Sequence, residues 1–133
     1  MHQQIYVNLP VKNLARSKAF FEAVGYRFNP QFTNDKGAGL ELGENLYAML
    51  LAEDFARTFT PKAIVDARTA TAGWVCLSCE SREEVDGLVA KARAAGGHIP
   101  GAAEDHGFMY SHGFEDPDGH HWELIHMTGM PQG

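Results

Sequence analysis

The sequence has few cysteines, no long apolar run and no excess of positive charge. Its 133 residues include only two cysteines, Cys76 and Cys79, too few for a disulfide framework, so a cytoplasmic protein is expected. No window approaches the roughly 18 apolar residues of a membrane span, and the N-terminus lacks the basic start and apolar run of a signal peptide. Lys and Arg number 11 against 17 Asp and Glu, a net charge of −6. Neither a nucleic acid nor a membrane is therefore an expected partner.

Strand and helix patterns follow each other in the first half of the chain. Ile5 to Val11 alternates as a half-buried strand does, and Asn13 stands where an N-cap is expected before the apolar stripe of residues 14–24. Two short strands, 39–42 and 46–51, follow around a turn. A further strand around residues 27–32 is left open by the pattern.

The same order returns in the second half. Residues 74–79 alternate, Ser81 and Glu84 form a Ser-x-x-Glu capping box, and apolar residues recur at helical spacing through Ala92. Strands at 108–114 and 120–127 are predicted around the turn Asp116-Pro117-Asp118-Gly119, with another strand left open near His98. The repeat predicts a duplicated module: one domain over 1–133, with module one at about 1–52, a linker at about 53–72 and module two at about 73–133.

The end of the chain carries a recognisable motif. Residues 113–124 read Gly-Phe-Glu-Asp-Pro-Asp-Gly-His-His-Trp-Glu-Leu and resemble the closing hairpin of the vicinal oxygen chelate superfamily. This superfamily includes glyoxalase I, bleomycin-resistance proteins, fosfomycin-resistance enzymes and ring-cleaving dioxygenases. Residues 9–21 resemble its first strand and helix, and residues 81–86 with 95–97 resemble the second helix of a bacterial lactoylglutathione lyase-like branch. The resemblance implies an α+β, glyoxalase-like fold: two βαβββ modules that form a cup, in a homodimer.

The resemblance also implies where a divalent metal ion would bind. In metal-using members, four positions on the floor of the cup offer His or Glu, and the last corresponds to Glu123. Superposing the two modules assigns the other three to Tyr6, Met49 and Trp74, none of which is an ordinary ligand for such an ion. Catalytic zinc usually takes three protein ligands, so no metal cofactor is expected. The one weak candidate pair is Glu123 with His121.

Strand alternation predicts a ligand pocket on the face opposite the helices. Asn8, Ser78, His121 and the Tyr6 hydroxyl are the expected hydrogen-bond donors to Glu123. Cys76 and Cys79 stand three apart in a strand, so their sulfur atoms are expected on opposite faces. The expected pocket residues are Tyr6, Asn8, Tyr47, Met49, Trp74, Cys76, Ser78, Met109, Ser111, His121 and Glu123.

Three functions are compatible with such a pocket. The preferred one is metal-free binding of a small flat or cationic organic molecule, through stacking, cation–π contact and one charged hydrogen bond, as the resemblance to bleomycin-resistance proteins implies. The second is a metal-dependent lactoylglutathione lyase-type lyase, or a related transferase or dioxygenase, with its metal on Glu123. The third is metal-free acid–base catalysis with Glu123 as the catalytic residue.

Overall fold

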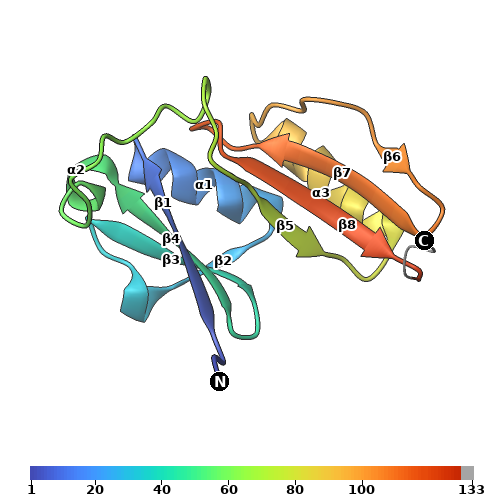
Figure 1. Cartoon of the computed structure of the whole chain (residues 1–133), viewed down its shortest axis with the longest axis horizontal. Helices are drawn as coiled ribbons and strands as arrows, with labels where there is room; N and C mark the ends of the chain where they lie inside the picture. Colours follow the sequence, from blue (N-terminus) through green and yellow to red (C-terminus); the bar gives the residue numbers. More distant parts are fainter. Residues whose placement is uncertain (130–133) are drawn as a thin grey trace. The chain divides into compact units, whose positions relative to one another are not determined.

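The chain folds into two compact units, residues 1–66 and 67–133 (Figure 1). The structure, a computed structural model, describes residues 1–129. The four strands of the first unit form a sheet in the order β1-β4-β3-β2, in which β1 runs parallel to β4 and the other neighbours are antiparallel. Its elements are β1 (Ile5–Val11), α1 (Leu14–Val24), β2 (Arg27–Asn29), the 3-10 turn η1 (Pro30–Phe32), β3 (Gly37–Gly43), β4 (Leu46–Ala52) and α2 (Glu53–Ala56).

The second unit repeats this arrangement. Its strands form a sheet in the order β5-β8-β7-β6, and β5 again runs parallel to its neighbour. The repeated order confirms the predicted α+β fold of two βαβββ modules. The elements are β5 (Val75–Ser78), α3 (Arg82–Ala94), β6 (Glu104–Asp105), β7 (Met109–Glu115) and β8 (His121–Met127).

Both long helices begin at the predicted caps. The Asn13 side chain accepts a hydrogen bond from the Arg16 N–H at 3.0 Å, and Ser81 Oγ accepts one from the Glu84 N–H at 3.0 Å. Such caps satisfy backbone donors that the first helical turn leaves unpaired. Helix α1 ends at Gly25, whose φ of 115° is left-handed and therefore favours glycine.

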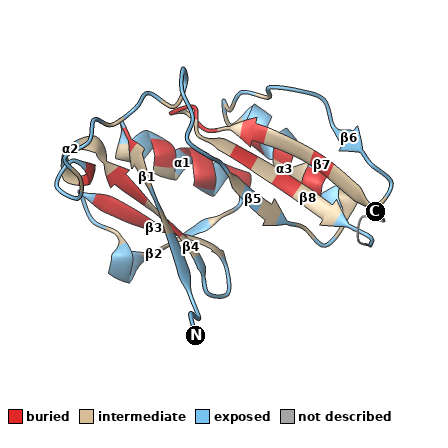
Figure 2. Ribbon diagram, in the orientation of Figure 1, coloured by how far each residue is buried: buried red, intermediate tan, exposed pale blue. Residues whose placement is uncertain are grey.

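Each unit buries one face of its sheet beneath a helix and leaves the other face more open. Figure 2 shows the buried residues along α1, β3 and β4, and again along α3, β7 and β8. Burial of each large apolar side chain contributes about 1.5–3 kcal/mol, so these two cores hold the units together. The central residues are Phe21, Val24, Leu40 and Leu50 in the first unit, and Val85, Phe114, Trp122 and Leu124 in the second.

Two segments left open by the sequence are resolved by the structure. Residues 27–32 form the short strand β2 and then η1, because Pro30 cannot donate to a sheet ladder and stands at the start of the 3-10 turn. Near His98 there is no full strand but a single antiparallel bridge to Glu115. Within residues 1–129, no helix is long and apolar enough to cross a membrane.

Candidate functional site

Asp116 organises the turn that leads into β8. Its Oδ1 atom accepts hydrogen bonds from the backbone N–H groups of Asp118 and His120, both at 3.0 Å, and its Oδ2 atom accepts one from the Trp122 indole at 3.1 Å. Burial raises the pKa of Asp116, whereas the His120 charge and these hydrogen bonds lower it. The sequence marked this segment as a turn, but it did not show that Asp116 also binds the indole beneath the sheet.

This anchor decides which side chains of β8 face the open side. Trp122 is 1% exposed and stacks on Phe114 with ring centroids 6.5 Å apart, on the side covered by α3. Since successive side chains of a strand alternate, His121 and Glu123 must then lie on the opposite, open face. This is the face that strand alternation in the sequence predicts for Glu123.

Gly113 keeps the space beside these two residues empty. It is the cross-strand partner of Glu123 in the antiparallel pair β7–β8. A Cβ atom added at Gly113 would lie 2.8 Å from the Trp122 carbonyl oxygen and 3.1 Å from Cε1 of His121. Sequence reasoning missed this residue, although a lone glycine inside a strand pattern is a known sign of close approach.

A cavity of about 230 Å³ opens at this point in the second unit. Glu104, Glu123, His121 and Ser111 contribute to its lining, together with the loop of residues 100–102, and Glu104 Oε2 also lies 3.2 Å from His106 Nε2. His112 Nε2 lies 2.9 Å from the Gly101 carbonyl oxygen and ties this loop to β7. Glu104 was missed because its two-residue strand, β6, has no periodicity that the sequence could reveal.

Cys76 is the hydrogen-bond partner of Glu123. The two residues pair across the parallel strands β5 and β8, and of the expected donors within the second unit neither Ser78 nor His121 takes this role. Partial burial, the hydrogen bond to Glu123 and the charge of that carboxylate raise the pKa of Cys76 to about 11. Burial, the hydrogen bond to Glu84 and the charge of that carboxylate raise the pKa of Cys79 to about 12. Both cysteines are free, and their thiols have different carboxylate partners, Glu123 for Cys76 and Glu84 for Cys79.

Trp74 supplies an exposed aromatic surface at the edge of this cluster. The residue is 60% exposed, and its indole meets the His121 ring edge to face, with centroids 5.9 Å apart. An exposed indole beside a carboxylate-lined cavity is the arrangement that a cation or a flat ring can use.

The predicted pocket residues fall into two groups, one in each unit. In the second unit, the cavity is lined by Ser111, His121 and Glu123. Trp74 contacts His121, and Cys76 contacts Glu123. Farther along the same face, Ser78 pairs with Ile125 and Met109 pairs with Met127. In the first unit Tyr6 and Asn8 pair with Tyr47 and Met49 on one face of the sheet. The Tyr6 and Tyr47 rings stack at 5.1 Å, and the Tyr6 hydroxyl donates to Gln4 at 2.6 Å.

A match to a protein-family model shows the superfamily of this chain. The family model described as the Glyoxalase/Bleomycin resistance protein/Dioxygenase superfamily matches residues 3–124. The chain belongs to this superfamily. Among curated proteins, no sequence matches significantly. The branch of lactoylglutathione lyase-like proteins is not singled out by these matches.

Several solved structures share the fold of this chain. A hypothetical protein from S. aureus is 28% identical, with a TM-score of 0.79 and 94% of each chain covered. A glyoxalase-related enzyme from Fulvimarina pelagi is 22% identical, with a TM-score of 0.80 over 100% of this chain and 94% of that one. A fosfomycin resistance protein from Listeria monocytogenes is 20% identical, with a TM-score of 0.71 over 96% and 95%. The last two are similar in fold alone.

The metal-binding positions of the superfamily do not suit a divalent ion in this chain. Three of the four hold Tyr6, Met49 and Trp74, whose side chains are a stacked phenol, a thioether and an indole. Among residues 1–129 no group of three or more His, Cys, Asp or Glu side chains is placed to hold a metal. Glu123 with His121 would offer two ligands, fewer than the three that catalytic zinc usually takes.

Proposed function

We propose that this superfamily member binds a small organic cation on the open face of its second sheet, without a metal and without converting it. The observation that carries the proposal is the cavity beside Gly113, where Glu123 and His121 stand next to the exposed Trp74. Two carboxylates, Glu104 and Glu123, line one small space and favour positive charge. At about 230 Å³ the cavity is smaller than a typical drug-sized pocket, so it suits the charged end of a ligand.

The flat part of the ligand would lie outside this cavity, on Trp74. An indole is the strongest cation–π partner among side chains and also stacks on flat rings. Met109 and Ser78 extend the same face. We further propose that Tyr6, Asn8, Tyr47 and Met49 complete an aromatic cup for the rest of the ligand, in a cytoplasmic homodimer of the kind that the superfamily resemblance implies. Light scattering tests the dimer, which requires twice the mass of one chain.

The superfamily also contains lyases, transferases and dioxygenases, but nothing in the site favours a metal-dependent reaction over binding. The metal positions offer one ordinary ligand, Glu123. A fosfomycin-type ligand is also disfavoured, because fosfomycin is an anion and the cavity presents two carboxylates. Bleomycin-resistance proteins, which sequester a drug, are the closer functional parallel.

Calorimetric titration with two probes of opposite charge tests this proposal. Benzyltrimethylammonium is expected to bind, whereas benzenesulfonate and fosfomycin bind at least about 10-fold more weakly. Glu123→Gln keeps the shape and removes the charge, so affinity for benzyltrimethylammonium falls about 10- to 100-fold, or about 1.5–3 kcal/mol. Glu22→Gln, the same change on the exposed side of α1, is the control and leaves binding unchanged. Equal effects of the two variants, or preference for an anion, would contradict the proposal.

A further inference from the structure

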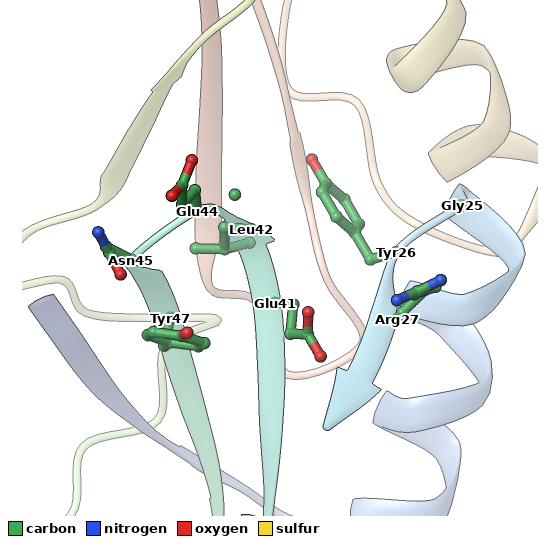
Figure 3. A pocket seen from close by; sticks show the side chains of 9 residues that line it. Gly25, Tyr26, Arg27, Glu41, Leu42, Glu44, Asn45 and Tyr47 are labelled. Atoms are coloured by element: carbon green, nitrogen blue, oxygen red, sulfur yellow. The ribbon is translucent and has the colours of Figure 1, made fainter. Parts of the chain in front are cut away.

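A second cavity lies in the first unit; it shares Tyr47 with the proposed aromatic cup but none of the residues that line the cation cavity of the second unit. It has a volume of about 440 Å³, within the range of ordinary small-molecule pockets. It lies beside the turn that joins β3 to β4 and next to the start of β2. Among its lining residues are Tyr26, Arg27, Glu41, Glu44, Asn45 and Tyr47 (Figure 3).

Three of these residues form a row across the sheet. Arg27 of β2 pairs with Glu41 of β3, and Glu41 pairs in turn with Tyr47 of β4. Directly paired residues have Cβ atoms about 4.5–5.5 Å apart, so a basic and an acidic side chain leave the sheet next to each other at the cavity. Figure 3 shows Glu41 between Tyr47 on one side and Arg27 and Tyr26 on the other.

The two charged groups are available to a ligand. Neither the Arg27 guanidinium nor the Glu41 carboxylate makes a hydrogen bond or an ion pair with any residue in the part of the chain that the structure describes. Even if the Arg27 and Glu41 side chains met, an exposed ion pair would contribute at most about 1 kcal/mol. A ligand that binds both groups therefore has little to displace.

Aromatic rings flank the charged pair. The Tyr47 ring is held by its stack on Tyr6, with the planes 10° apart. Tyr26 packs against Phe21 of α1, with ring centroids 6.2 Å apart. Both rings are therefore fixed by packing, which reduces the entropy lost when a flat ligand stacks on one of them.

We propose that this cavity binds a free α-amino acid with an aromatic side chain. The carboxylate of such a molecule meets the Arg27 guanidinium, which can donate two parallel hydrogen bonds, and its ammonium group meets Glu41. The short separation of the two charges in an α-amino acid suits the short separation of cross-strand partners. The aromatic side chain stacks on Tyr47.

The experiment compares three probes by ¹H–¹⁵N chemical-shift titration. L-Phenylalanine carries both charges, phenethylamine lacks the carboxylate, and 3-phenylpropionate lacks the amine. Phenylalanine is expected to shift the amides of residues 25–27 and 41–47, and to bind at least about 10-fold more tightly than either analogue. Equal binding of the three probes, shifts confined to other residues, or no shift up to about 20 mM would overturn the proposal.

Two variants test which protein side chain binds each charged group of the ligand. Arg27→Gln removes the preference for phenylalanine over phenethylamine, and Glu41→Gln removes the preference over 3-phenylpropionate. Arg16→Gln and Glu22→Gln, at exposed positions of α1, are the matched controls and keep both preferences. Unchanged preferences in Arg27→Gln and Glu41→Gln, with unchanged unfolding midpoints, would reject the assignment. Glu123→Gln must leave phenylalanine binding intact, which separates this site from the cation site of the second unit.

Discussion

Cys76 and Glu123 pair across the parallel strands β5 and β8, and the thiol donates a hydrogen bond to the carboxylate. This contact satisfies one oxygen of a carboxylate that otherwise faces a small cavity. It also makes Cys76 a reporter of Glu123, because burial, the hydrogen bond to Glu123 and the charge of that carboxylate together raise the pKa of the thiol to about 11.

Alkylation of Cys76 should therefore be slow at neutral pH. The thiolate is the reactive form, so the rate with iodoacetamide is expected to rise about tenfold per pH unit until about pH 11. Glu123→Gln removes the negative charge, lowers the pKa of Cys76 and speeds its alkylation at pH 8. Peptide mass spectrometry follows Cys76 and Cys79 separately. Glu84→Gln is the control: it lowers the pKa of Cys79 and should leave the alkylation rate of Cys76 unchanged. If Glu123→Gln does not change the alkylation rate of Cys76, the contact between the two residues is contradicted.

The same raised pKa values make stability depend on alkaline pH. In the unfolded chain the thiols ionise near their ordinary value of 9.0, whereas in the folded chain Cys76 stays protonated to about 11. The stabilising contribution is complete below pH 9 and is lost as pH rises through about 11. Urea unfolding should therefore show falling stability across this window, and a smaller fall in Cys76→Ala. Identical slopes in the two proteins would count against the account.

Asp116→Ala should destabilise the second unit. It leaves the Trp122 indole and the backbone N–H groups of Asp118 and His120 without their acceptor. A loss of about 2–4 kcal/mol in the free energy of unfolding is expected. Asp116→Asn should lose less, since one oxygen remains for the two backbone donors. Asp35→Ala, at an exposed loop position, serves as the control with a change below about 0.5 kcal/mol. Equal losses in Asp35→Ala and Asp116→Ala would contradict the role of Asp116.

Gly113→Ala should close the cation site and cost stability. The new Cβ atom would approach the Trp122 carbonyl oxygen to 2.8 Å, so the β7–β8 pair must shift and the space beside His121 fills. A loss of about 1–3 kcal/mol is expected, together with loss of benzyltrimethylammonium binding. Gly87→Ala is the matched comparison, because α3 has open space at that position and alanine favours helix by about 0.5–1 kcal/mol. Retained binding in Gly113→Ala would rule out this cavity as the site.

Much of the fold follows from local patterns in the sequence. Local sequence patterns predicted the caps at Asn13 and Ser81, the alternation of β1 and β8, and the Asp-Pro-Asp-Gly turn. Each of these features depends on residues close together in the sequence. Strand β6 was not predicted, since two residues carry no period and its pairing with β7 depends on tertiary contacts. Glu104 was missed for the same reason. The partnership of Cys76 with Glu123 required the register between β5 and β8, which the resemblance of β5 to β1 did not supply.

Purified protein should carry no stoichiometric transition metal. Of the four superfamily metal positions only Glu123 bears an ordinary ligand, and an isolated carboxylate holds a divalent ion weakly. Elemental analysis after dialysis should find far less than one Zn, Ni or Fe per chain. About one metal per chain, lost in Glu123→Gln and kept in Glu22→Gln, would contradict the assignment of the site as metal-free.

The most direct test of the central claim is a crystal structure of the protein soaked with benzyltrimethylammonium. The account predicts that the ammonium group lies against the Glu123 carboxylate in the space beside Gly113, with the phenyl ring on Trp74 within about 6 Å of the indole. A divalent metal on Glu123 and His121, or the cation bound elsewhere with this cavity left to water, would contradict it.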